Sequence, residues 1–305
     1  MPERTLPPAN GITTTTNATN ATNIKPSPAA PTADGNSIQQ PPLHQVCSSL
    51  NTRISTFLAS PPPTDRLRNV QEQTRISLGV LQEALSQYGP SELSISYNGG
   101  KDCLVLLVLF LAALDRWSQS QPQSQYPPPP KAQQQQSQQP SLSKSLQSVY
   151  IIPPHPFAEV DSFVDYSVHA YALDLARYAM PMKLAFETYL HERPRVKAIL
   201  VGTRRTDPHG GALSFFDKTD HGWPVFMRVH PVIDWHYAEI WAGYTSLGGT
   251  TDTHPNPALL ETPVVRLSGK EGLHFRPAYE LVEDEEERLG RDRATSMGIQ
   301  TPRGS

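Results

Sequence analysis

Hydrophobic residues follow two alternating periods along much of the chain. Between Thr64 and Gly89, apolar side chains recur every three or four positions, which predicts an amphipathic helix capped by Thr64. Residues 93–97 alternate apolar and polar as a half-buried strand does. Residues 102–117 are rich in Leu, Val and Ala and predict a buried helix. Two glycines separate this strand from this helix.

The same alternation continues to residue 242. The pattern predicts strands at 148–152, 196–201 and 229–233, and helices at 158–168, 181–192 and 234–242, the last capped by Asp234. Alternating strands and helices are typical of an α/β fold with a doubly wound, mostly parallel sheet. Ligands bind such sheets beyond the carboxyl ends of the strands. Residues 96–103 and 202–211 both follow a predicted strand.

Two stretches lack the apolar residues that a core requires. Residues 1–42 consist largely of Thr, Asn, Ala and Pro, and residues 118–147 are rich in Gln and Pro. Because neither can bury enough surface to offset the entropy of ordering, we expect a disordered extension and a low-complexity insertion. This leaves one domain at residues 43–293, followed by a flexible tail at 294–305.

Composition narrows the functional classes. The net charge is −3 and the basic residues are scattered, which argues against nucleic-acid binding. The two cysteines, Cys47 and Cys103, are too few for a disulfide framework or a cysteine-based metal site. No secretory signal pattern opens the chain, and the longest apolar run, 103–114, is shorter than the ~20 residues of a membrane span. We expect a soluble cytoplasmic protein with no obligate protein partner.

The segment Ser96-Tyr-Asn-Gly-Gly-Lys-Asp-Cys103 is the strongest candidate for a binding site. A Gly-Gly pair between strand and helix lets the backbone turn sharply, while the first N–H groups of the helix point toward an anion. The spacing does not match the Walker A loop. The segment is therefore a candidate pyrophosphate loop, with an ordinary glycine-rich turn as the alternative.

A second polar loop follows the strand at 196–201. Residues 202–211 contain Arg204, Arg205 and Asp207 together with three glycines. Arginines suit phosphate oxygens, and an Asp among phosphates is tolerated when a metal ion offsets the repulsion. The alternative is a solvated loop with a local Arg–Asp pair. We assign no catalytic role to His209.

Two further segments carry candidate ligands. In residues 217–224, Trp223 stands near Asp220 and either stacks on a flat heterocycle or fills the core beneath the loop. In residues 283–293, dense mixed charge predicts a solvated, salt-bridged helix end for the carboxylates. Arg288 and Arg291 of this segment are candidates for contact with an anionic ligand from a mobile tail.

Together these motifs resemble the fungal FMN adenylyltransferases, or FAD synthases, of the PAPS-reductase-like PP-loop family. Asn98 and Cys103 replace the first and last Ser of the usual Ser-Gly-Gly-x-Asp-Ser loop. The most specific matches are the loop at 96–103, Gly-Thr-Arg-Arg-Thr-Asp-Pro at 202–208, Tyr-Thr-Ser-Leu-Gly-Gly-Thr at 244–250 and Phe-Arg-Pro-Ala-Tyr-Glu-Leu at 275–281. The resemblance implies a fold of the adenine-nucleotide alpha-hydrolase type and the reaction of FMN with ATP to give FAD and pyrophosphate, with magnesium.

The resemblance also implies residue roles. ATP would be bound by Ser96, Tyr97, Asn98, Gly99, Gly100, Lys101, Asp102, Gly202 and Arg204. Magnesium would be held by Asp102 and Asp207, and flavin by Asp207, Asp220 and Trp223. The catalytic set would be Asn98, Asp220, Arg288 and Arg291, with the side chain of Lys101 pointing toward or away from ATP.

One departure from the family leaves an alternative open. Family members have a helix and a connection where Ala242 here runs directly into Gly243, so a dozen or more residues are lacking. A single peptide bond cannot span that distance, and we predict reduced stability and an inactive flavin- or nucleotide-binding variant as the rival function. PAPS reductase or thiolation chemistry is disfavoured, because no cysteine follows Cys103.

Overall fold

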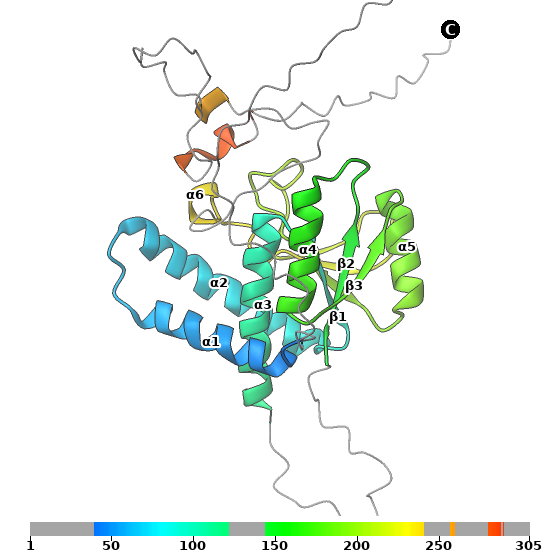
Figure 1. Ribbon diagram of the computed structural model, residues 1–305, viewed down its shortest axis with the longest axis horizontal. Helices are drawn as coiled ribbons and strands as arrows, with labels where there is room; N and C mark the ends of the chain where they lie inside the picture. The colour runs from blue at the N-terminus through cyan, green and yellow to red at the C-terminus, as the bar shows by residue number, and fades with distance from the viewer. Residues whose placement is uncertain (1–39, 122–143, 241–256, 260–279, 288, 290–305) are drawn as a thin grey trace, which may run out of the picture. The chain divides into compact units, whose positions relative to one another are not determined.

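A six-stranded, mostly parallel sheet organises the fold (Figure 1). The computed structural model describes residues 40–121, 144–240, 257–259, 280–287 and 289. The strands are β1 (Leu93–Ser96), β2 (Leu146–Ile151), β3 (Leu173–Tyr178), β4 (Ala198–Leu200), β5 (Phe216–Lys218) and β6 (Met227–Val229). Their order is β3-β2-β1-β4-β6-β5, and β5 alone of these six is antiparallel to its neighbour. The predicted α/β class with a mostly parallel sheet is confirmed.

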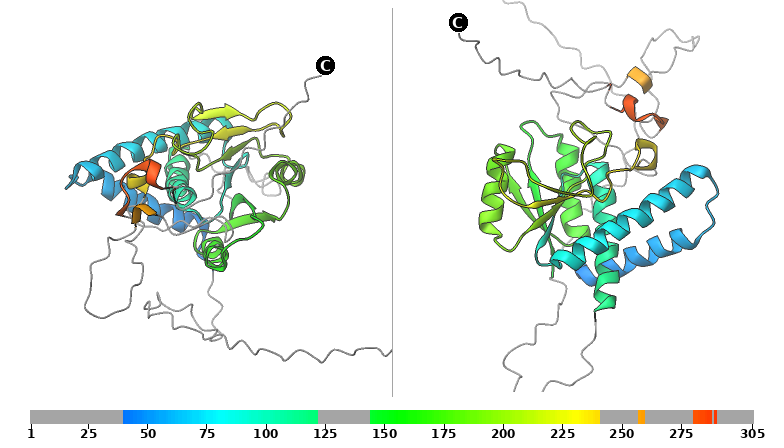
Figure 2. Two further views of the ribbon diagram at one scale, coloured as in Figure 1. Left: turned by 90° about the horizontal axis from the view of Figure 1, so that it is seen from above. Right: turned by 180° about the vertical axis from the view of Figure 1, so that it is seen from behind.

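Helices cover both faces of this sheet (Figure 2). They are α1 (Leu43–Ala59), α2 (Asp65–Tyr88), α3 (Lys101–Ser120), α4 (Ala158–Ala170), α5 (Met182–Glu192) and α6 (Tyr237–Ile240). Side chains of α1 to α4 share one apolar cluster with one face of the sheet, and α5 packs on the other face. Within β4, Leu200 belongs to the first cluster and Ile199 to the second, because successive strand residues point to opposite faces.

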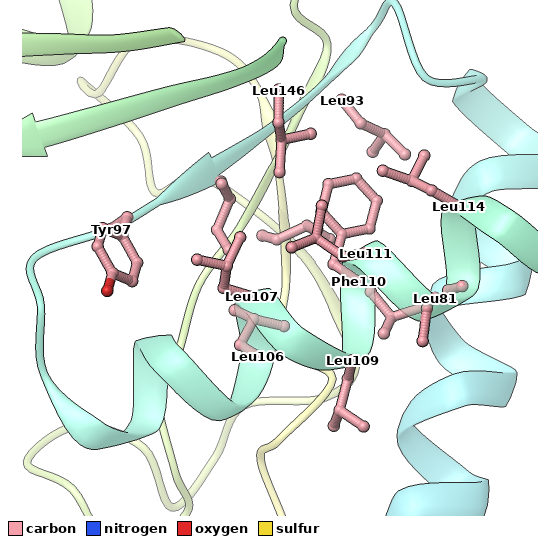
Figure 3. Close-up of a cluster of buried hydrophobic side chains, with 14 of the residues drawn as sticks. Leu81, Leu93, Tyr97, Leu106, Leu107, Leu109, Phe110, Leu111, Leu114 and Leu146 are labelled. Carbon is pink, nitrogen blue, oxygen red and sulfur yellow. The ribbon is translucent and has the colours of Figure 1, made fainter. Parts of the chain in front are cut away.

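Helix α3 supplies the centre of the larger cluster (Figure 3). Leu107, Phe110 and Leu111 are fully buried and point from α3 toward β1, with Leu81 of α2 nearby. In the described part of the chain, α3 is the one helix that passes a length-and-composition test for a membrane span, and 61% of the tested window is buried inside the fold. That burial identifies α3 as a core helix, which explains its apolar character.

The predicted helix after Thr64 is confirmed as α2. The Thr64 hydroxyl accepts a hydrogen bond from the Leu67 N–H at 3.2 Å, and Gly89 ends the helix with a positive φ of 68°. A side-chain acceptor at this position satisfies one of the N–H groups that the first turn of a helix leaves without a partner. Local sequence signals were sufficient here, because Thr64 marks the start of the helix and Gly89 marks its end.

The prediction for residues 229–242 is wrong in detail. Strand β6 ends at Val229, where the predicted strand begins; residues 231–234 form a turn, and α6 begins at Tyr237, three residues after the predicted start, and is described as far as Ile240. Asp234 pairs with Arg205 at 2.6 Å and does not cap α6. The apolar residues Val232 and Ile233 are fully buried in the turn. Their apolar character is therefore explained by burial and not by an extended strand.

The sequence pattern missed α1, β3 and β5. Strand β3 is an edge strand whose central residues are only partly buried, and β5 has three residues of which none is buried, so neither shows a strong apolar run. The predicted low-complexity segments at 1–42 and 118–147 lie outside the described residues for 1–39 and 122–143, and the ends of the second one, 118–120 and 146–147, belong to helix and strand. The elements beside the second gap are α3, which runs to Ser120, and β2, which begins at Leu146.

A buried serine should contribute measurably to stability. The Ser77 hydroxyl donates to Pro231 O at 2.6 Å and accepts from Trp235 Nε1 at 2.9 Å. Ser77→Ala would leave both groups without this partner inside the core, and we expect a loss of about 2 kcal/mol in the free energy of unfolding, measured by urea denaturation. Ser86→Ala on the exposed face of α2 is the matched control and should change stability by less than about 0.5 kcal/mol. Equal effects of the two changes would contradict this role.

Candidate nucleotide site

Two loops meet at the carboxyl ends of neighbouring parallel strands. Strand β1 pairs with β4 so that Ile95 lies beside Leu200, and residues 97–100 and 201–211 leave these strands in the same direction. The gap between two such loops is where an open α/β sheet binds its ligand. The two segments that the sequence singled out are therefore brought together.

The first loop requires its glycines. Gly99 has a φ of 75°, and a Cβ there would lie 2.8 Å from Val164 Cγ2 of α4. The Gly100 N–H donates to Asn98 Oδ1 at 2.9 Å, which fixes the loop immediately before α3 begins. On the neighbouring loop, a Cβ at Gly202 would lie 3.0 Å from the backbone nitrogen of Cys103. The backbone at Gly202 thus packs directly against the first turn of α3, which only a residue without a side chain allows.

Lys101 is buried under the loop and does not extend into solvent. Its Nζ donates to Asp102 Oδ2 at 2.9 Å and to Glu287 Oε1 at 2.6 Å, and only 1% of its side chain is exposed. It also lies 5.3 Å from the ring centroid of Tyr237, a cation–π contact. The sequence left two orientations possible for the Lys101 side chain. In the structure, this side chain points into the protein interior.

Arg204 is the centre of the site. Its guanidinium is 1% exposed and faces four carboxylates, at 2.9 Å for Asp102 Oδ1 and at 3.5 Å for Asp207 Oδ1 and Asp284 Oδ1, with a further ion pair to Glu287. The contact of Nε with Asp102 is an ion pair whose geometry does not form a hydrogen bond. Burial by itself would lower the pKa of Arg204, but these carboxylates outweigh it, led by Asp102, and raise it.

Asp207 also shapes the backbone of its own turn. Its Oδ2 accepts from the Arg204 N–H at 2.9 Å, and a Cβ at Gly210 would lie 2.1 Å from Arg204 O. Arg205 points elsewhere, since it pairs with Asp234 and donates to Leu213 O at 2.9 Å. The two adjacent arginines therefore have different roles: Arg204 orders the site, and Arg205 fastens the loop to the turn after β6.

A segment from the end of the chain completes this network. Residues 280–287 include the 3-10 helix Asp284–Glu286, and Leu281 packs with Tyr237 and Leu259 in a small buried cluster. The Asp284 carboxylate accepts from the Tyr237 N–H and lies 2.6 Å from His236 Nδ1. The prediction that the carboxylates of this segment are solvated is wrong for Asp284 and Glu287, whose side chains are only 10% and 11% exposed.

The sum of charges at this cluster is negative. Among the described residues, Lys101 and Arg204 face the four carboxylates of Asp102, Asp207, Asp284 and Glu287, and His236 beside Asp284 adds a positive charge when it is protonated. Burial would raise the pKa of Glu287, yet Lys101 and Arg204 outweigh it and hold the pKa below its usual value. Burial, followed by the charge of Asp102, raises the pKa of the Cys103 thiol to about 12, so Cys103 is not a nucleophile.

The remaining loop residues divide into exposed and buried groups. Asn98 is exposed, and Ser96 ends β1 with partial burial. Tyr97 is fully buried, and its hydroxyl donates to Ser167 Oγ at 2.8 Å, so its side chain supports α4. His209 is exposed and adopts a φ of 65°.

Asp220 and Trp223 lie on a different part of the sheet. They occupy the turn between β5 and β6, and because β6 runs parallel to β4, this turn lies at the beginning of β6, beside the start of β4 and not its end. Asp220 is held 3.5 Å from Arg228 and is 75% exposed at its side chain. Trp223 is 37% exposed, so it does not fill the core beneath the turn. The structure does not bring these two residues to the 97–100 loop.

Three predicted features fall outside the described residues. Arg288 and Arg291 do, and so does the junction of Ala242 and Gly243. Their predicted roles, and the predicted consequence of the lacking segment, stay predictions.

Sequence reasoning missed Asp284, Glu287 and His236 as members of the site. They are distant in sequence from both loops, and an acidic run such as 283–287 has the composition of an ordinary solvated surface. One signal was available in the apolar pair Leu281-Val282 just before the acidic run, because Leu281 is the residue that anchors the segment.

Comparison with known proteins agrees with this geometry. The phosphoadenosine phosphosulfate reductase domain family matches residues 176–255. The crystal structure of Candida glabrata FMN adenylyltransferase in complex with FAD and inorganic pyrophosphate superposes with a TM-score of 0.71 at 27% identity, covering 82% of this chain and 99% of that one. The fold and the loop pair therefore define a PAPS-reductase-like α/β enzyme of the nucleotidyltransferase class.

Sequence relatives narrow this class to one family. A probable FAD synthase of Schizosaccharomyces pombe is 36% identical over 254 residues, which is 78% of this chain and 86% of the relative. The flavin adenine dinucleotide synthase of Saccharomyces cerevisiae is 31% identical and covers 68% of this chain and 72% of its own length. The chain belongs to the FAD synthase family.

The His236–Asp284 pair predicts a pH-dependent contribution to stability. Hydrogen bonding to Asp284 is the main cause that raises the pKa of His236 in the folded protein. The contribution is therefore complete below the unfolded value of 6.5 and is lost as the pH rises through the raised folded value. It should stay below about 1 kcal/mol, because the side chain is 65% exposed and the pair is screened.

This prediction is checked by urea denaturation of wild type and His236→Asn at about pH 6 and about pH 9. The difference between the two proteins should be larger at the lower pH. His209→Asn, at an exposed histidine, should show no such difference. A His236→Asn effect that does not change with pH would contradict the assignment.

Proposed function

We propose that this chain transfers the adenylyl group of ATP to FMN, giving FAD and pyrophosphate. The observation that carries the proposal is the meeting of the glycine loop at 97–100 with the Arg204–Asp207 turn at the ends of β1 and β4. Family membership supports the same reaction, since solved relatives include Candida glabrata FMN adenylyltransferase in complex with FMN and an ATP analogue.

The reaction requires that the two substrates be positioned together, and it does not require a general base. The second pKa of a phosphate monoester is about 6, so the FMN phosphate is largely dianionic at neutral pH and its oxygen attacks the α-phosphorus of ATP without prior deprotonation. The bond that breaks joins the α-phosphorus to the bridging oxygen, and pyrophosphate leaves with that electron pair. The protein must bring two anions together and stabilise the charge that collects on pyrophosphate.

The described residues can supply these functions. Asn98, Gly99 and Gly100 form the turn into α3, whose first N–H groups face the space beyond the sheet and suit phosphate oxygens. Gly202 and the backbone around Arg204 form the opposite wall. One well-placed donor of this kind is worth about 3 kcal/mol in a transition state.

The carboxylates fit a magnesium ion carried with ATP. Within the described residues no three His, Cys, Asp or Glu side chains converge as a complete metal site. Magnesium is usually held by one or two carboxylates together with substrate phosphates, and Asp102 and Asp207 provide such oxygens. When bound, the ion would neutralise charge on the departing pyrophosphate.

The flavin ring is proposed to lie toward the β5–β6 turn. FMN is elongated, with a ribityl chain between its phosphate and its ring, so the ring need not lie at the glycine loop. Trp223 offers an exposed aromatic face, and the turn is rigid because Thr219 Oγ1 donates to Pro224 O at 2.7 Å and the Trp223 N–H donates to Asp220 O at 3.0 Å. Arg288 and Arg291 are proposed to close over phosphate from the tail.

The reaction is tested by incubating the purified chain with ATP, FMN and magnesium. We expect FAD and pyrophosphate in equal amounts, resolved by chromatography, and a fall of FAD formation to background when EDTA removes the metal. Excess magnesium should restore it. FAD formation that is undiminished in EDTA would contradict the magnesium proposal.

The alternative function is an inactive nucleotide- or flavin-binding variant, which we expect if the segment lacking between Ala242 and Gly243 is needed for activity. A chain that binds FMN and ATP by calorimetry and forms no FAD would be the inactive variant, and a chain that binds neither would contradict both functions. Insertion of the corresponding segment of the Schizosaccharomyces pombe relative between these residues would then show whether its loss is the cause.

A matched pair of substitutions tests the flavin proposal. Trp223→Ala should raise the KM for FMN roughly tenfold and leave the KM for ATP unchanged, because one stacking face for the ring is lost. Val225→Ala is the control, since Val225 is 89% exposed on the same turn. Steady-state kinetics with each substrate varied in turn distinguishes them. An unchanged KM for FMN in Trp223→Ala would place the ring elsewhere.

A further inference from the structure

The Glu287 carboxylate connects the two halves of the candidate nucleotide site, the start of α3 and the turn after β4. It lies at the end of the described C-terminal segment, yet its Oε1 accepts from Lys101 Nζ at 2.6 Å and its Oε2 accepts from Arg204. Lys101 is the first residue of α3, and Arg204 belongs to the turn after β4. A single carboxylate thus bridges Lys101 and Arg204. The Glu287 side chain is 11% exposed.

The two cations held by Glu287 also hold the candidate metal carboxylates. Lys101 donates to Asp102 at 2.9 Å, and Arg204 contacts Asp102 at 2.9 Å and Asp207 at 3.5 Å. Each cation is therefore shared between Glu287 and a residue that faces the ligand. Without the charge of Glu287, Lys101 would act on Asp102, and Arg204 on Asp102, Asp207 and Asp284. The two cations would then draw Asp102 and Asp207 inward and neutralise more of the charge that a magnesium–ATP complex requires.

The segment does not depend on Glu287 for its attachment. Asp284 accepts from the Tyr237 N–H and lies 2.6 Å from His236, and Leu281 is buried against Tyr237 and Leu259. A change at Glu287 can therefore alter the charges beneath the loops while residues 280–286 stay docked. This separates a role in positioning from a role in folding.

We propose that Glu287 is a positioning residue of the nucleotide site: by sharing Lys101 and Arg204, it holds Asp102 and Asp207 in the arrangement that receives magnesium–ATP. The proposal rests on the proposed function for the identity of the ligand. Glu287 touches neither substrate in this account, and it acts through the two buried cations.

The test compares Glu287→Gln with Glu285→Gln. Both changes remove one negative charge with little change of shape, but Glu285 is exposed in the same 3-10 helix. By calorimetry, Glu287→Gln should bind ATP with magnesium roughly tenfold more weakly than wild type, since a charged hydrogen-bond acceptor is lost. Its affinity for FMN, followed by flavin fluorescence, should be unchanged, and Glu285→Gln should resemble wild type in both measurements.

A double-mutant cycle identifies the route of the effect. If Glu287 acts through Lys101, the change Glu287→Gln should weaken ATP binding less in a Lys101→Met background than in wild type, because one of the two cations it balances is already absent. Equal factors in the two backgrounds would overturn this route. Thermal unfolding of every variant, with and without ATP, accompanies the cycle.

The outcomes separate the inference from the proposed function. Equal ATP affinity of Glu287→Gln and Glu285→Gln overturns the inference even when wild type forms FAD. A Glu287→Gln protein that loses ATP and FMN affinity together, with a lowered Tm, also overturns it, because that pattern marks a general structural role. A wild type that binds magnesium–ATP and forms no FAD counts against the proposed function alone, and the comparison of ATP affinities still decides the inference.

Discussion

The site depends on a buried arginine that is surrounded by acids. Arg204 is almost inaccessible to solvent, and a buried guanidinium persists in a protein only when carboxylates and hydrogen bonds replace the water it has lost. Its partners Asp102, Asp207, Asp284 and Glu287 come from three regions of the chain. Ion pairs are strong in a region of low dielectric, so the positions of these three regions are linked through Arg204.

The sheet explains why this linkage falls at the candidate nucleotide site. Parallel pairing of β1 with β4 places both loops on one edge, and the core helix α3 begins at that edge because its apolar side chains pack along the sheet. Gly99 and Gly202 allow the two backbones to meet there, where Cβ atoms would collide with α4 and with Cys103. The polar cluster beneath them then determines the local charge. The same edge thus combines backbone donors, which suit phosphate, with an excess of carboxylate charge, which suits a divalent cation.

Much of the fold could be predicted from local signals. Helix α2 carries a capping threonine and a terminal glycine, α3 follows a Gly-Gly pair, β1 alternates apolar and polar residues, and β2 and β4 contain apolar residues buried on both faces. Strands β3 and β5 escaped prediction because edge strands are only half covered and show a weaker pattern. The apolar residues 232–233 were mistaken for a strand, because burial in a turn produces the same local composition as burial in a sheet.

The sequence by itself determined the fold class, the two loops of the candidate site and the family, because each is carried by contiguous residues whose backbone requirements are local. Tertiary structure alone decided the side-chain roles. Lys101 points inward and pairs with Glu287, and Arg205 points away from the site and pairs with Asp234. The acidic run near the end of the chain contributes Glu287 to the site through its ion pair with Arg204. These outcomes follow from ion pairs between residues up to 186 positions apart, and the desolvation that makes such pairs decisive exists only once the chain has folded.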